Sequence, residues 1–220
     1  MLNYLLMTLF NYSIIIAAII AIVRFKSIMA DYYPFVFFIW LGLFNEILSL
    51  FLIYNYQSNS ANSNIYVLTE YMILLMQFYK WNNKDIKKYY VLAAIGIAVW
   101  ITDNFIINTL SQNNSVFRVF YCFVILFFSI DKLNKLLVFE YGNLLKHPMF
   151  IICVTFVFYY GFKAFVESFN MVHLGLNPAI LRDLWIILYF VNGTANLLYA
   201  IAVLCIPTKL KFTSRWQEVL

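Results

Sequence analysis

The sequence contains very little charge. Only 11% of its 220 residues are Asp, Glu, Lys or Arg, whereas 64% are hydrophobic. A soluble domain is typically about a quarter charged and about half apolar. The chain therefore has too little polar surface to cover a water-soluble globule, and we expect much of it to face a lipid bilayer.

Histidine and cysteine are also scarce, which excludes several kinds of site. His147 and His173 both fall in predicted loops, and the three cysteines fall singly inside apolar runs. These residues match no metal-ligand spacing and no disulfide framework. The sequence also lacks a glycine-rich phosphate loop and a nucleophile elbow, so neither a metal nor a cofactor is expected. An enzyme is the least supported class, although buried carboxylates leave acid catalysis open.

Long apolar runs dominate what is present. A helix needs roughly 20 apolar residues to cross the hydrocarbon core. The runs that fit this length are 3–23, 33–54, 64–80, 88–108, 115–133, 149–169 and 179–206. Because they are continuous, they do not fit the alternating strands of a membrane barrel. The sequence predicts an all-α, polytopic integral membrane bundle of seven transmembrane helices, a single domain over residues 1–220 with no soluble domain.

The basic residues predict how this bundle is oriented. Most of them fall in alternate connections and the tail: Arg24, Lys26, Lys80, Lys84, Lys87, Lys88, Lys132, Lys135, Lys146, Lys209, Lys211 and Arg215. The opposite loops, 55–64 and 109–115, contain none. Cytoplasmic loops are enriched in Lys and Arg. We therefore expect the N-terminus outside, the C-terminus in the cytoplasm, and a multi-pass cell-membrane protein, with the bacterial inner membrane as its location. No basic and aromatic cluster suggests a nucleic-acid partner.

Charged and polar residues nevertheless occur inside the predicted helices, and they fall in the outer half. The candidate site residues are Glu46, Glu70, Asp103, Arg118, Lys163, Glu167, Arg182, Asp183, Trp185, Tyr189, Asn192 and Asn196. Ionisable residues within a membrane usually face the bundle interior or a wet cavity and often mark a site. The acids in this set outnumber the bases, so a ligand cation, an ion or a proton is expected to compensate them.

Each of these groups also has a structural interpretation. Lys163 and Glu167 are spaced for an i,i+4 pair at the outer surface, and Arg182 and Asp183 for an interfacial pair. Asp103 and Arg118 could bridge two helices. The polar stripe from Trp185 to Asn196 could serve helix packing. Glu46 and Glu70 lie deepest and have no cation on their own helix, so binding and structural roles stay equally open for them.

One segment carries a resemblance. The closing stretch 184-LWIILYFVNGTANLLYAIAVLCIP-207 has an LW pair, two spaced asparagines and a small-residue AIA near its end. It resembles the last helix of uncharacterised small seven-helix bacterial inner-membrane proteins. The resemblance implies the fold and the location and brings no established activity with it.

Three functions follow from these expectations. The first is a receptor-like or ligand-binding membrane protein that signals through a cytoplasmic or membrane protein partner. Its outer cavity would bind a small cationic or zwitterionic molecule or an ion. The second is a proton- or ion-coupled transporter of small solutes, with Glu46 and Glu70 as carriers. The third is a structural subunit of a membrane complex, whose buried charges only specify helix packing.

The composition of the inner half of the bundle distinguishes the receptor-like function from the transporter. The segments 35–44, 123–128 and 149–158 are almost purely apolar and bulky. If their faces meet, they form a dry plug, and moving an unpaired charge through it would cost several kcal/mol or more. No proline inside a predicted helix provides a hinge there. The sequence therefore predicts an outward-facing pocket that ends near Asn192.

Overall fold

The described part of the chain is helical. The computed structural model describes residues 10, 12–82, 86–139, 143–172 and 178–208. It contains the α-helices α2 (Ile14–Arg24), α3 (Tyr33–Tyr56), α4 (Ser60–Asn82), α5 (Ile86–Ile101), α6 (Val116–Phe139), α7 (Pro148–Val172) and α8 (Pro178–Cys205). Short helical turns are η1 (Ala30–Tyr32), η2 (Thr102–Ile107) and η3 (Leu144–Lys146). The predicted all-α class is confirmed for these residues, in which only an isolated bridge, Ile28 to Thr208, has β geometry.

The helix ends follow the residues expected to place them. Pro148 and Pro178 are the first residues of α7 and α8, where the missing N–H of proline is tolerated. Helix α3 ends at Gln57, whose φ of 58° lies in the left-handed region that terminates helices. These signals explain why most predicted helix limits lie close to the observed ones.

Three predicted helices need correction, and one is only partly described. The predicted helix 115–133 continues to Phe139 in α6, past the charged residues that were expected to lie in a connection. Helix α4 begins at Ser60 and not at residue 64. Its first turn consists mostly of polar, partly exposed residues, so the apolar run in the sequence starts later than the helix. The predicted helix 88–108 is α-helical only to Ile101 and continues as the π-helical turn η2. The first part of the predicted helix 3–23 lies outside the described residues.

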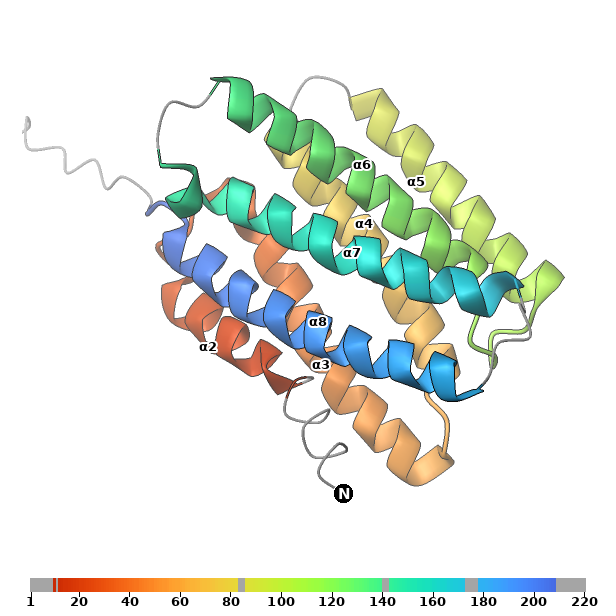
Figure 1. Ribbon diagram of the computed structural model, residues 1–220. Helices are drawn as coiled ribbons and strands as arrows, with labels where there is room; N and C mark the ends of the chain where they lie inside the picture. Colours follow the sequence, from red (N-terminus) through yellow and green to blue (C-terminus); the bar gives the residue numbers. More distant parts are fainter. Residues whose placement is uncertain (1–9, 11, 83–85, 140–142, 173–177, 209–220) are drawn as a thin grey trace, which may run out of the picture.

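The helices are arranged in a closed ring (Figure 1). Each packs against the next along the chain, and α2 packs against α8, which closes the ring. Ala17, Ala18 and Ala21 are fully buried, and their small side chains allow α2 to lie close to its neighbours. At the end of α2, the guanidinium of Arg24 donates hydrogen bonds to the carbonyls of Val203, Leu204 and Ile206. Arg24 thereby caps the C-terminal end of α8.

The outer surface of the ring is apolar, as expected for a membrane protein. Four helical segments are long and apolar enough to cross a membrane: Ala30–Tyr56, Ile86–Ile107, Pro148–Met171 and Ile180–Cys205. Helix α2 is apolar but shorter, and α4 is less apolar than the others. Large side chains such as Val23 and Phe127 are 79% and 71% exposed. So much exposed apolar surface is compatible with lipid and unfavourable in water.

An aromatic cluster fills one half of the ring interior. The ring of Phe156 lies 6.3 Å from that of Phe35, 5.9 Å from that of Phe38 and 6.1 Å from that of Phe78. Phe78 also stacks on Phe128 at 5.2 Å. The apolar faces of segments 35–44, 123–128 and 149–158 therefore do meet, as predicted. This half of the interior is closely packed and offers few polar partners.

Candidate functional site

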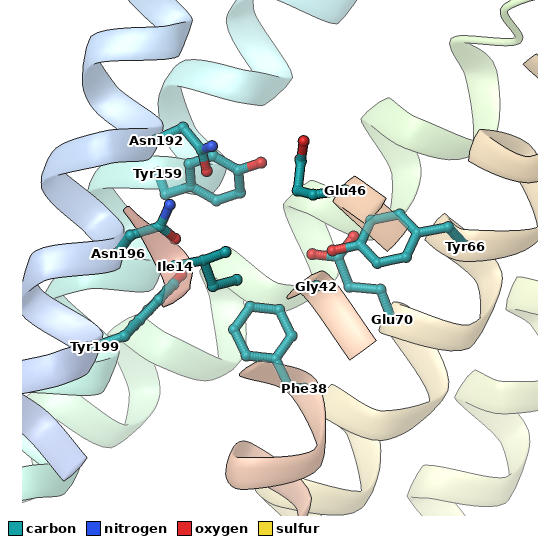
Figure 2. Close-up of a pocket in the computed structure, with 10 residues that line it drawn as sticks. All are labelled: Ile14, Phe38, Gly42, Glu46, Tyr66, Glu70, Tyr159, Asn192, Asn196 and Tyr199. Carbon is teal, nitrogen blue, oxygen red and sulfur yellow. The ribbon is translucent and has the colours of Figure 1, made fainter. Parts of the chain in front are cut away.

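A polar cavity occupies the other half of the ring interior. Its inner part, which we name the deep chamber, has a volume of about 80 Å³. Figure 2 shows Glu46 pointing into this space, with Tyr66 and Glu70 on one side and residues of α7 and α8 on the other. The lining residues are Ile14, Phe38, Gly42, Glu46, Tyr66, Glu70, Tyr159, Asn192, Asn196 and Tyr199.

The deep chamber is continuous with a wider vestibule. Glu46, Tyr66, Tyr159 and Asn192 line both parts. The vestibule has a volume of about 620 Å³, within the usual range for small-molecule sites. Ser60 and Asn113 lie at its rim, next to the connections that contain no Lys or Arg. The cavity therefore opens at the end of the bundle opposite the basic connections.

Most of the predicted site residues lie on the wall of this cavity. They are Glu46, Glu70, Arg118, Lys163, Glu167, Trp185, Tyr189, Asn192 and Asn196. The predicted limit of the pocket at Asn192 is wrong by about two helical turns, because Asn196 and Tyr199 also line the deep chamber. Tyr199 marks the limit instead, where its ring packs against the aromatic cluster, 5.4 Å from Phe38.

Glu70 and Lys163 form a buried network between the cavity and the helices behind it. The Lys163 Nζ atom lies 3.8 Å from Glu70 Oε2, and both side chains are almost completely buried. Tyr121 and Tyr160 donate hydrogen bonds from their hydroxyls to the two carboxylate oxygens of Glu70. Lys163 in turn donates to the hydroxyl of Tyr121. Every charged group of this network therefore has a partner of opposite charge.

A second buried ion pair lies nearer the rim. Arg118 Nη1 is 3.8 Å from Glu167 Oε1, and Ser115 donates a 2.7 Å hydrogen bond to the other oxygen of Glu167. Arg118 also donates to Ser63 and to the side-chain oxygen of Asn64 on α4. This pair connects α4, α6 and α7 at the mouth of the cavity.

The expected pair between Lys163 and Glu167 is not formed. Each residue pairs across the ring instead, Lys163 with Glu70 and Glu167 with Arg118. The physical reason is depth: at this level the side chains of α7 point into the ring, where carboxylates and a guanidinium from other helices offer buried partners. The interpretation as a surface pair is therefore wrong.

Glu46 differs from the other cavity acids because no cation compensates it. Among the described residues, no Lys or Arg lies within ion-pair distance of its carboxylate. Its side chain is partly buried and lines both the deep chamber and the vestibule. Because Glu70 pairs with Lys163 and Glu167 with Arg118, Glu46 is the one carboxyl group among the described cavity residues that has no cation partner.

The deep chamber also contains a buried polar atom without a partner. The hydroxyl of Tyr199 makes no hydrogen bond within the described residues, although the side chain is 2% exposed. Buried hydroxyls are normally satisfied, and leaving one unpaired costs about 1–3 kcal/mol. Asn196, one turn away, donates to Ser13 through its side-chain nitrogen, so its side-chain oxygen can accept a further bond.

Three predicted site residues lie away from the cavity. Asp103 is fully buried, but its two oxygens accept hydrogen bonds from Asn108 and from the backbone N–H of Phe117. It joins η2 to the start of α6, and the proposed bridge to Arg118 is not formed. Arg182 and Asp183 form an exposed pair at 3.4 Å, as expected from their spacing, and their position at a membrane interface stays a prediction.

Apart from Tyr189, the tyrosines of the site could not be singled out from the sequence. Tyr121 and Tyr159 surround Lys163, and Tyr66 lines both parts of the cavity. The chain contains 17 tyrosines, so no one of them is distinctive by residue type. The helical offset from Lys163 back to Tyr159 and Tyr160, close to one turn, was the only signal for these residues.

Comparison with known proteins gives no further assignment. No protein-family model, curated protein or solved structure matches the chain. The resemblance of the last helix to small bacterial inner-membrane proteins therefore stays a prediction. Among the described residues, no group of three or more His, Cys, Asp or Glu side chains could hold a metal ion.

Proposed function

We propose that the protein is a receptor-like, ligand-binding membrane protein. Seven helices cross the bilayer, and the cavity opens on the outside. The observation that carries the proposal is the cavity itself. It is polar at one end, contains the surplus carboxylate of Glu46 and the unpaired Tyr199 hydroxyl, and stops at the aromatic cluster. Such a shape can hold a small solute without giving it a path to the other side.

The direction of the helices supports seven crossings. Ser13, before α2, contacts Asn196 of α8, and Arg24 at the end of α2 contacts Val203. Helices α2 and α8 therefore run parallel. A chain that crosses once with each helix from α2 to α7 returns to its starting side, so α8 must then run parallel to α2. The apolar outer surface agrees with this arrangement.

A proton-coupled transporter is the second candidate. Its support is also Glu46, because an uncompensated carboxylate in a cavity could carry a proton. The packed rings of Phe35, Phe78 and Phe156 argue against it, since they fill the interior beyond Tyr199 with apolar side chains.

Access to the cavity tests the proposal. Asn192→Cys is made in a chain whose native cysteines, Cys122, Cys153 and Cys205, are replaced by alanine. A membrane-impermeant thiol reagent should label Asn192→Cys from the outside of intact cells and leave it unlabelled in inside-out vesicles. Ile39→Cys, in the fully buried apolar half, should react from neither side.

A transport assay in proteoliposomes tests the second candidate. The purified protein should show no solute-driven proton flux. A flux that is abolished by Glu46→Gln, together with labelling of Asn192→Cys from both sides, would contradict the receptor-like function and establish the transporter.

A further inference from the structure

We propose that the cavity recognises the ammonium group of a small organic amine, with its nitrogen beside Glu46 and tyrosine rings around it. The inference rests on the proposed function, because it names the chemical class of ligand for the same one-sided cavity. Four observations carry it: the charge of the cavity, an internal precedent, the hydrogen-bonding groups, and the size of the deep chamber.

The charge of the cavity favours a monovalent cation. Arg118 pairs with Glu167 and Lys163 with Glu70, which leaves the Glu46 carboxyl as the single acid without a counter-charge among the described cavity residues. Ca²⁺ and Mg²⁺ require six or more oxygen ligands and are usually bound by more than one carboxylate. Glu70 cannot serve as a second ligand without losing its bonds from Tyr121, Tyr160 and Lys163.

The protein already holds one ammonium group in the way that we propose. The Nζ atom of Lys163 lies 5.2 Å, 5.4 Å and 5.9 Å from the ring centroids of Tyr121, Tyr159 and Tyr160, and it pairs with the carboxylate of Glu70. Ammonium groups within about 6 Å of an aromatic ring are stabilised by cation–π attraction. One carboxylate and several tyrosine rings are thus sufficient to hold an ammonium group at this depth.

The deep chamber has the same kinds of group, a carboxyl and several tyrosine rings, and no Lys or Arg side chain among its lining residues. Glu46 supplies the carboxylate, and Tyr66, Tyr159 and Tyr199 supply the rings. Tyr159 belongs to both sets, so the two ammonium positions would share one ring. A bare alkali ion would gain less here, because aromatic rings do not replace the oxygen ligands of its hydration shell.

The hydrogen-bonding groups also fit an ammonium donor. An ammonium group donates up to three hydrogen bonds and accepts none. The carboxylate of Glu46 and the side-chain oxygen of Asn196 are acceptors, and the unpaired hydroxyl of Tyr199 can accept as well. The chamber volume of about 80 Å³ is several times what one water molecule needs, which leaves space for a short alkyl chain.

The test measures protection of a cysteine in the vestibule. Ser49→Cys is made in the cysteine-free chain, because Ser49 lies one helical turn from Glu46 and lines the vestibule. The rate of labelling from outside is measured with propylammonium up to about 10 mM. At ten times the dissociation constant, occupancy should lower the labelling rate about tenfold.

Two variants make the test specific. Glu46→Gln should abolish the protection by propylammonium, and Glu46→Asp should retain it at higher concentration. Asp183→Asn is the matched control: it removes the same charge from an exposed pair outside the cavity and should leave the protection unchanged. Loss of protection in Asp183→Asn would show a general charge effect and overturn the proposal.

The competing solutes identify the ligand class. Propan-1-ol, propionate, sodium ions and calcium ions should each fail to protect. If any of them protects as well as propylammonium, or if neither propylammonium nor a lipid with an ammonium headgroup protects, the ammonium proposal is overturned while the ligand cavity stands. If Ser49→Cys is not labelled from outside at all, the proposed function fails with it.

A lipid headgroup could supply the same chemistry as a free amine. The measurement is therefore made first in nanodiscs of phosphatidylglycerol and then in nanodiscs that also contain phosphatidylethanolamine. Protection by the second lipid mixture alone, lost in Glu46→Gln, would support an ammonium ligand and assign it to the membrane. Protection only on addition of propylammonium would assign it to a free amine.

Discussion

At Glu70, one carboxylate is held by an ammonium group and two phenol hydroxyls that come from α6 and α7. Removing either partner of a buried ion pair leaves the other charge without compensation, which usually costs about 3–5 kcal/mol. We therefore expect that removing either Glu70 or Lys163 alone destabilises the fold, because the other residue is then left buried and charged without a partner.

A double-mutant cycle tests this expectation. Lys163→Met should lower the free energy of unfolding in detergent micelles by about 3 kcal/mol. Combining it with Glu70→Gln should recover much of that loss, because neither buried charge then remains. If the two losses simply add, the residues do not act as a pair.

The choice of these partners could not be predicted from the sequence. The sequence placed Lys163, Glu167, Glu46 and Glu70 in the same half of the bundle, and in the structure they line one cavity. It favoured the pair on a single helix because offsets along one helix are all that a sequence provides. The observed pairs depend on which helices are neighbours in the ring, and no pattern in the chain specifies that.

Helix α5 packs closely against α4 at a glycine, Gly96. A Cβ atom at Gly96 would lie 2.2 Å from Cε1 of Tyr71, whose ring is fully buried and whose hydroxyl donates to the carbonyl of Leu92. The absence of a side chain at Gly96 is therefore what lets α4 and α5 approach each other.

Alanine substitutions test this contact. Gly96→Ala should lower the free energy of unfolding by about 2 kcal/mol, because the buried ring has to move. Gly161→Ala is the control, since a Cβ there meets only Leu126 at 3.8 Å. It should be neutral or stabilise by up to about 1 kcal/mol, because alanine favours helix. Equal effects of the two changes would contradict the packing argument.

The presence and approximate positions of the helices were the most predictable features of the chain. Continuous apolar runs predicted each of the described helices, and proline positions predicted where α3, α7 and α8 begin. The π-helical turn η2 was not predictable, because it depends on tertiary contacts: Asp103 accepts the backbone N–H of Phe117, and Asn104 accepts a bond from Asn114.

For the molecule as a whole, the basic residues predict which end faces the cytoplasm. Ser111 lies in an exposed connection at the mouth of the cavity, and Leu145, in η3, is 77% exposed at the opposite end. In intact cells, Ser111→Cys should react with an impermeant thiol reagent and Leu145→Cys should not. The reverse pattern would place the cavity on the cytoplasmic side.

The contact between Arg24 and α8 also bears on how the chain is made. Arg24 and Val203 are 179 residues apart. At a synthesis rate of about 5–20 residues per second, roughly 10–35 s pass between their appearance. During that interval the alanine face of α2 lacks its partner helix, and the guanidinium lacks its carbonyl acceptors. A nascent chain arrested before α8 is thus an open row of helices, which quality-control proteases of the membrane can distinguish from the finished ring.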